Sequence, residues 1–216
     1  MGKRYCTVES LKAQKIIKLS KSCISDKEKI AVQKVLDHEY LGMGAEVKEF
    51  EDLLSNYFGR KAVCVINGTA ALHLALQAVN IKKDDEVLVQ SNTYVASFQA
   101  ISATGGIPIP CDIDPHTLCI DISDAEKKLT SKTKAIMPVH YAGGVGDLDE
   151  IYKFASKNKL RVIEDAAHAF GSKYNSKKIG SFGDITCFSF DGIKNITSGE
   201  GGCVVTNDKN VINRIC

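Results

Sequence analysis

The chain has 216 residues, of which 44% are hydrophobic and 25% are charged, as is typical of a soluble globular protein. Lys and Arg number 28 against 26 Asp and Glu, and this net charge of +2 gives no electrostatic reason to expect binding to nucleic acid or to an anionic membrane. The apolar runs are far shorter than the roughly 20 residues of a membrane-crossing helix, and the Lys-rich N-terminus lacks the apolar core of a signal peptide, so we expect a cytoplasmic protein.

The first elements are predicted to be an arm and two helices. Residues 1–24 show no clear periodicity and are predicted to form an N-terminal arm ahead of a domain over residues 25–216. Ser25 and Glu28 have the spacing of a capping box, which predicts the start of a helix. A second helix with apolar residues at helical spacing follows over residues 47–58, and Gly59 suits its C-terminal cap.

From residue 62 onward the pattern alternates between strands and helices. Strands are predicted at 62–66, 86–90, 107–111, 134–139, 161–164, 185–190 and 203–206, and helices at 69–79, 94–104 and 148–156. Short apolar strands separated by helices predict a largely parallel sheet covered on both faces. A last helix begins near Val211 and stops after about two turns, so we expect the chain to be the N-terminal part of a longer polypeptide.

Cysteine and histidine usage gives no sign of a metal site. The eight cysteines include no C-x-x-C pair, and several lie inside apolar strands, so we interpret them as reduced and structural. The five histidines show no H-E-x-x-H pattern. We therefore predict no bound metal.

Two segments that follow predicted strands are suited to ligand binding. In open parallel sheets, ligands bind at the carboxyl ends of strands. Gly68 and Thr69 follow the first strand and lead directly into a helix, whose free amides and Thr69 hydroxyl suit a phosphate group, although helix capping alone would also explain them. Tyr94 follows the second strand and either packs on a neighbour or faces a ligand at the same edge.

Asp165 and His168 follow the strand over residues 161–164. A carboxylate at the end of a buried strand needs a cationic partner or several hydrogen-bond donors. His168 comes about one helical turn later and points into the same region. A structural ion pair would explain Asp165 alone.

Ser189 ends a further strand, and the loop after it presents Lys194 ahead of the glycine-rich turn at 199–202. Most loop lysines are solvated, and a lysine amine becomes a nucleophile only through burial beside positive charge or capture as an imine. An imine-forming lysine, an aspartate for a pyridinium nitrogen and an anion-binding helix start are the parts that a pyridoxal phosphate site requires.

At these residues the chain resembles the DegT/DnrJ/EryC1/StrS aminotransferases, which act on nucleotide-linked keto sugars. The resemblance runs from about Ile17 to the last residue and rests on motifs that occur in order: Asn67-Gly-Thr-Ala-Ala-Leu-His73, Pro138-Val-His-Tyr-Ala142, Val162-Ile-Glu-Asp-Ala-Ala-His168, Phe188-Ser-Phe190, and Lys194 with Gly199-Glu-Gly-Gly202. It implies the large domain of a fold-type I pyridoxal phosphate transferase, an α/β fold with a mostly parallel mixed sheet and helices on both faces. The family's smaller C-terminal domain is expected to be missing here.

The resemblance also implies roles for individual residues. Lys194 would attach pyridoxal 5'-phosphate covalently and move the substrate proton, and Asp165 would pair with the pyridine nitrogen, which makes these two the catalytic residues. His168 would lie near the phenolic oxygen or the ring, and Tyr94 would stack on the ring. The phosphate would be held by Gly68, Thr69 and Ser189.

The implied reaction moves an amino group from a donor such as L-glutamate to a nucleotide-linked keto-deoxy sugar, in a homodimer with shared active sites. Dehydratase relatives carry His at the position of Lys194, so the lysine favours transamination. The sequence does not distinguish thymidine from uridine sugars, or amination at ring position three from position four. A non-catalytic or regulatory relative that binds the cofactor remains the alternative, whereas a dinucleotide-binding reductase is disfavoured by the absence of a G-x-G-x-x-G after the first strand.

Overall fold

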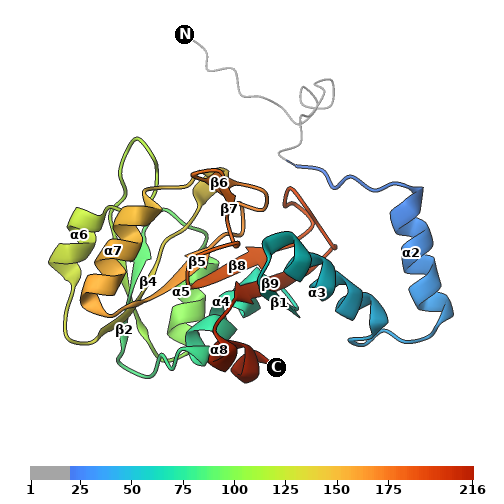
Figure 1. Cartoon of the computed structure of the whole chain (residues 1–216), viewed down its shortest axis with the longest axis horizontal. Helices are drawn as coiled ribbons and strands as arrows, with labels where there is room; N and C mark the ends of the chain where they lie inside the picture. The colour runs from blue at the N-terminus through green and yellow to red at the C-terminus, as the bar shows by residue number, and fades with distance from the viewer. Residues whose placement is uncertain (1–19) are drawn as a thin grey trace, which may run out of the picture.

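The computed structural model describes residues 20–216, and most of the predicted N-terminal arm lies outside them. The described chain is built around one seven-stranded sheet with helices on both faces (Figure 1). The predicted α/β fold with a mostly parallel mixed sheet is confirmed.

The strand order places six parallel strands and one antiparallel strand in the sheet. Along the sheet the strands are β1 (Lys61–Val65), β9 (Gly202–Thr206), β8 (Ile185–Ser189), β5 (Arg161–Asp165), β4 (Thr133–Met137), β2 (Glu86–Gln90) and β3 (Ile107–Cys111). Only β9 is antiparallel to its neighbours, β1 and β8, so the other strands all run in one direction. Their carboxyl ends therefore meet at one edge of the sheet, where a parallel sheet binds ligands.

Each face of the sheet is covered by three helices. Helices α4 (Gly68–Ala78), α5 (Val95–Ala103) and α8 (Lys209–Ile215) pack on one face, and α3 (Ala45–Phe58), α6 (Ile122–Lys128) and α7 (Leu148–Asn158) pack on the other. Successive side chains of a strand point to opposite faces. In β2, for example, Val87 and Val89 pack in the α4 and α5 layer, whereas Leu88 packs in the α6 and α7 layer.

The first described helix, α2 (Asp26–Asp37), lies apart from the sheet (Figure 1). The predicted capping box is present, with the Ser25 and Glu28 side chains each bonded to a backbone amide at the helix start. None of its residues is buried, and its apolar Ile30, Val32 and Leu36 are more than half exposed. Gly59 ends the next helix, α3, with a left-handed φ of 66°, as predicted.

Two features were not predicted from the sequence pattern. Helix α6 lies between residues 112 and 133, a segment for which no helix or strand is predicted. Its two buried apolar side chains, Ile122 and Ala125, are too few to show a periodicity. A hairpin of β6 (Lys173–Tyr174) and β7 (Lys177–Lys178) follows β5, and its turn holds Asn175 and Ser176 at positive φ. The other predicted boundaries differ from the observed ones by at most about two residues.

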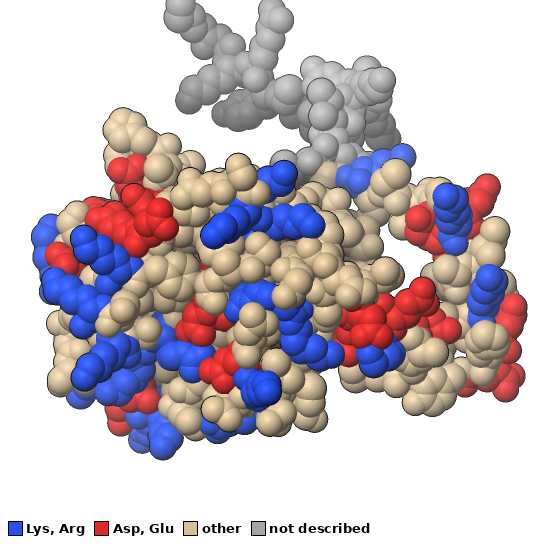
Figure 2. Space-filling model, in the orientation of Figure 1, with Lys and Arg blue, Asp and Glu red and all other residues tan. Residues whose placement is uncertain are grey.

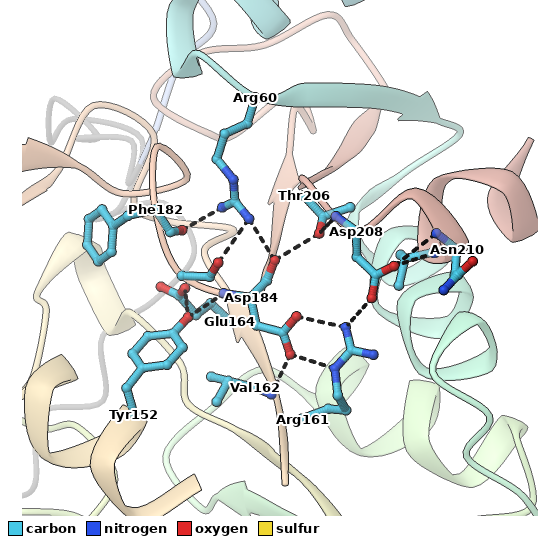
Figure 3. A network of polar contacts seen from close by, with 12 residues as sticks. Arg60, Tyr152, Arg161, Val162, Glu164, Phe182, Asp184, Thr206, Asp208 and Asn210 are labelled. Atoms are coloured by element: carbon cyan, nitrogen blue, oxygen red, sulfur yellow. Dashed lines mark hydrogen bonds and ion pairs between the residues drawn. The ribbon is translucent and has the colours of Figure 1, made fainter. Parts of the chain in front are cut away.

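A buried arginine holds the loop that leads into β8. The Arg60 side chain, of a residue that is 6% exposed, donates hydrogen bonds to the carbonyl oxygens of Gly180, Phe182, Gly183 and Asp184 at 2.5 to 3.2 Å. Figure 3 shows its bonds to Phe182 and Asp184. Arg161, in β5, binds the same loop, because its guanidinium donates two 2.7 Å hydrogen bonds to the Asp184 carboxylate. These contacts fix the start of β8, the strand that ends at Ser189.

The described cysteines are free thiols, at positions 23, 64, 111, 119, 187, 203 and 216. Burial raises the pKa of the Cys64 and Cys111 thiols to about 11, so both stay protonated at neutral pH.

On the face shown in Figure 2, positive and negative side chains are interspersed. Over residues 20–216 none of the helices combines the length and the hydropathy that a membrane crossing needs.

We predict that Gly183→Ala destabilises the protein by about 3 kcal/mol or more. Gly183 has φ +83°, and an added Cβ would lie 2.1 Å from the Tyr152 hydroxyl and 2.8 Å from Glu164 Oε1, so the buried hydrogen bond between those two groups would have to break. Gly59→Ala is the matched control, because its φ is also positive but nothing lies within 4 Å of the added Cβ, and it should cost only about 1 kcal/mol. Urea unfolding of the two variants checks the difference, and equal losses would contradict the steric explanation.

Candidate active site

A cavity of about 530 Å³ opens at the carboxyl ends of the parallel strands. All the site residues predicted from the sequence line it: Gly68, Thr69, Tyr94, Asp165, His168, Ser189 and Lys194. They come from the ends of β1, β2, β5 and β8, and more than 120 residues separate the first from the last. The structure therefore brings together every residue of the predicted site, and their chemical roles remain predictions.

The end of β5 supplies two consecutive buried carboxylates that point in opposite directions. Glu164, 1% exposed, faces the α7 layer, where its oxygens contact Tyr152 Oη at 2.7 Å and His140 Nε2 at 2.8 Å. Asp165, 5% exposed, faces the α4 and α5 side and lines the cavity. Because successive side chains of a strand point to opposite faces, Glu164 belongs to the core and Asp165 lines the cavity.

The Asp165 carboxylate is held by neutral donors. Ser97 Oγ lies 2.8 Å from Oδ2, and the Ala167 amide lies 3.1 Å from Oδ1. Among residues 20–216 neither oxygen takes part in an ion pair. A carboxylate accepts about four hydrogen bonds, so acceptor capacity remains on the cavity side for a positively charged donor.

The start of α4 lines the cavity and has the backbone features that suit an anion, and we call it the anion cradle. Asn67 caps the helix through a 2.8 Å bond to the Ala70 amide, and the amides of the first two helical residues, Gly68 and Thr69, have no partner within the helix. A Cβ on Gly68 would lie 2.8 Å from Cβ of Ser189, so only glycine allows α4 and the end of β8 to approach this closely. Gly68, Thr69 and Ser189 thus line the cavity at a helix start, where the helix dipole favours negative charge.

His168 lines the cavity, and the charges of both Lys194 and Asp165 act on its imidazole. Burial and the nearby Lys194 ammonium lower the pKa of its imidazole, and Asp165 opposes them only in part. The Ala142 amide donates to Nδ1 at 3.3 Å, so the neutral ring carries its proton on Nε2. His168 is therefore a neutral hydrogen-bond donor in the cavity wall at neutral pH.

The Lys194 loop is tied to the structure on both sides of the lysine. The amides of Phe190 and Ser198 bond to the carbonyl oxygens of Gly201 and Phe190 at 2.8 and 3.0 Å, and Asn195 Nδ2 bonds to the Phe170 carbonyl at 2.9 Å. The lysine side chain is half-buried and lines the cavity together with Asp165. A loop anchored in this way holds an amine at one place on the cavity wall.

Tyr94 stands at the mouth of the cavity. It is the N-cap residue of α5, its side chain makes no capping hydrogen bond, and its ring is 70% exposed. The ring is therefore not packed on a neighbour in the core, which was the alternative reading of this residue. It is free to cover a ligand.

Sequence reasoning missed Ser97 and Thr93, whose hydroxyls lie 2.7 Å apart next to Asp165. A polar residue on the apolar face of the segment Val95-Ala-Ser-Phe-Gln-Ala-Ile101 was the available signal. His140, in the motif after β4, is buried on the Glu164 side and is not among the cavity residues. No cluster of three or more metal-binding side chains occurs within the described part of the chain.

Comparison with known proteins points to one family. The model of the DegT/DnrJ/EryC1/StrS aminotransferase family matches residues 22–216. A protein of Escherichia coli O157:H7 named GDP-perosamine synthase is 46% identical over 202 residues, which cover 93% of this chain and 56% of that protein. The chain spans about half the length of the curated relatives it matches.

Solved structures agree with the sequence comparison. The crystal structure of S. venezuelae DesV in complex with a ketimine intermediate has a TM-score of 0.85 and 37% identity, and the match covers 88% of this chain and 52% of that chain. The PLP form of the putative sugar aminotransferase Spr1654 from Streptococcus pneumoniae has a TM-score of 0.86 and 34% identity, covering 91% and 54%.

We predict that His168 makes stability depend on pH below neutrality. Its pKa is lower in the folded than in the unfolded chain, so the unfolded state binds more protons as the pH falls through about 6.5. The stability that the neutral ring contributes is fully present above that pH and is lost on acidification, at no more than about 1.4 kcal/mol per pH unit. Unfolding free energies from pH 7.5 to 5.5 should therefore show a flatter slope for His168→Gln. The exposed His38→Gln is the control, and equal slopes for wild type and His168→Gln would refute the assignment.

Proposed function

Because this chain belongs to the DegT/DnrJ/EryC1/StrS aminotransferase family, we propose that it is a pyridoxal phosphate-dependent aminotransferase that acts on a nucleotide-linked keto-deoxy sugar. Residues 25–216 would be its cofactor-binding large domain. The observation that carries the proposal is that Lys194 and the buried Asp165 line one cavity with the anion cradle of α4.

The residues of the cavity fit the cofactor. The Gly68, Thr69 and Ser189 cradle suits the phosphate group, and the free acceptor capacity of Asp165 suits the proton on a pyridine nitrogen. Tyr94 at the mouth suits one face of the ring, and the Nε2 proton of His168 suits the phenolic oxygen. When bound, pyridoxal phosphate supplies an aldehyde that carries the amino group and a ring that accepts electrons.

The chain's own residues have separate tasks in this proposal. Lys194 supplies the amine that anchors the cofactor, and it moves a proton at the reacting carbon of the substrate. Asp165 keeps its partner nitrogen protonated, because an ionised carboxylate with little solvent around it stabilises a positive charge strongly. L-Glutamate is the proposed amino donor, a homodimer with shared sites the proposed assembly and the cytoplasm the proposed compartment.

We predict that Lys194 is the point of covalent attachment. Wild-type protein mixed with pyridoxal phosphate and reduced with borohydride should gain one cofactor mass, located by peptide mass spectrometry on the segment that contains Lys194. Lys194→Ala should gain none, because no other lysine among residues 20–216 lines the cavity, whereas Lys177→Ala, at the exposed start of β7, should behave as wild type. A wild-type protein that takes up no cofactor would contradict the proposed function and the alternative of a non-catalytic cofactor-binding relative alike.

We propose a GDP-linked sugar as the substrate, since the Escherichia coli relative is named for a GDP-linked product. This goes beyond the thymidine and uridine sugars that sequence reasoning considered. Among GDP-, dTDP- and UDP-linked keto-deoxy-hexoses, the GDP-linked sugar should be converted with a kcat/KM at least about tenfold above the others, as expected where polar groups of a site read a base. Product analysis by mass spectrometry with L-glutamate as donor tests this, and a preference for dTDP or UDP would overturn the choice of nucleotide.

A further inference from the structure

Ser97 lies fully buried in the first turn of α5, and its hydroxyl is directed at the site rather than at its own helix. Its Oγ is 2.8 Å from Asp165 Oδ2, a partner 68 residues away in the sequence. The same oxygen lies 2.7 Å from Thr93 Oγ1. Three side chains from two separate parts of the chain therefore form one hydrogen-bonded row that ends at the Asp165 carboxylate.

The direction of the protons in this row follows from the chemistry of its members. An ionised carboxylate only accepts hydrogen bonds, so Ser97 must donate its single proton to Asp165. The remaining capacity of Ser97 is to accept, so Thr93 must donate to Ser97. Thr93 lines the cavity, whereas Ser97 is not among the cavity residues. The row thus leads from the cavity wall, through a buried hydroxyl, to the carboxylate.

This arrangement decides which part of Asp165 can face a ligand. The Ala167 amide bonds to Oδ1 and Ser97 bonds to Oδ2, so a tilt of the carboxylate plane about its last bond would weaken both hydrogen bonds. Both donors are neutral, and they leave the negative charge available for a cationic group from the cavity. A lysine or arginine in place of Ser97 would have neutralised that charge internally.

We propose that Ser97, supported by Thr93, is a positioning residue that fixes the Asp165 carboxylate for a positively charged ring nitrogen in the cavity. The inference rests on the proposed function, because it takes the ring to be that of pyridoxal phosphate. Ser97 acts through Asp165, and Thr93 acts through Ser97.

The test measures the apparent Kd for pyridoxal phosphate by absorbance titration of the whole chain. Ser97→Ala should bind about tenfold more weakly, the size expected for loss of one hydrogen bond to a charged group. Thr93→Val should bind about threefold more weakly, since it loses a bond between neutral groups. Ser97→Thr, which restores the hydroxyl, should regain most of the affinity. Ser102→Ala, an exposed serine on the same helix, should match the wild type.

The double variant tests whether Thr93 and Ser97 act together as one hydrogen-bonded row or independently of each other. If Thr93 acts only through Ser97, Ser97→Ala with Thr93→Val should bind no more weakly than Ser97→Ala alone. Thermal unfolding of the cofactor-free proteins identifies any variant that fails to fold, and the half-buried Thr93→Val then carries the test.

Three results would overturn the inference. They are wild-type affinity in Ser97→Ala, losses that add in the double variant, and no recovery in a Ser97→Thr protein that melts like the wild type. A wild type that binds no pyridoxal phosphate would mark failure of the proposed function itself, which keeps the two outcomes distinct.

Discussion

The structure depends on how it satisfies two adjacent buried carboxylates at the end of β5. An ionised carboxylate without partners in a protein interior costs several kcal/mol, so each must find donors. Glu164 has three side-chain partners, from Tyr152, Thr186 and His140, and it is a closed unit of the core. Asp165 has one hydroxyl and one amide, and its remaining capacity opens into the cavity. The difference between these neighbours separates the part of the sheet that stabilises the fold from the part available to a ligand.

A network of polar side chains runs from Glu164 through Tyr152 to the turn at Asp184, away from the cavity, and supports the strands that carry the site residues. Burial and the adjacent Glu164 carboxylate raise the pKa of Tyr152, whose hydroxyl keeps its proton for Glu164 and accepts the Asp184 amide at 2.9 Å. Arg60 and Arg161 grip the same turn, as Figure 3 shows. This network fixes the start of β8, and the rigid strand carries that position to Ser189 and the Lys194 loop at its other end. A charged cluster whose residues do not line the cavity thus contributes to the geometry of the cavity.

Much of the fold and of the candidate site could be predicted from the sequence, and the exceptions have physical reasons. The strand periods, the capping box at Ser25 and the left-handed glycine at position 59 are local signals, and each was found where expected. The residues that line the cavity could be predicted because they lie at the ends of strands or within a few residues after them, and parallel strands bring such residues to one edge. Helix α6 was missed because a helix of seven residues, with two buried apolar side chains, has no measurable period.

The sequence by itself determined which residues lie at strand ends, which glycines allow turns and which helix begins directly after a strand, because these features depend on neighbours a few positions away. Only the tertiary structure decided that Ser97 forms a hydrogen bond with Asp165 and that Arg60 binds the carbonyl oxygens of the 180–184 turn. It also decided which partners the two carboxylates find on the opposite faces of the sheet, as in the bond of Glu164 to Tyr152. Such partners are far apart along the chain, and they meet through the strand order β1-β9-β8-β5-β4-β2-β3. That order is set by packing of the whole sheet between two helix layers, and no local pattern of residues encodes it.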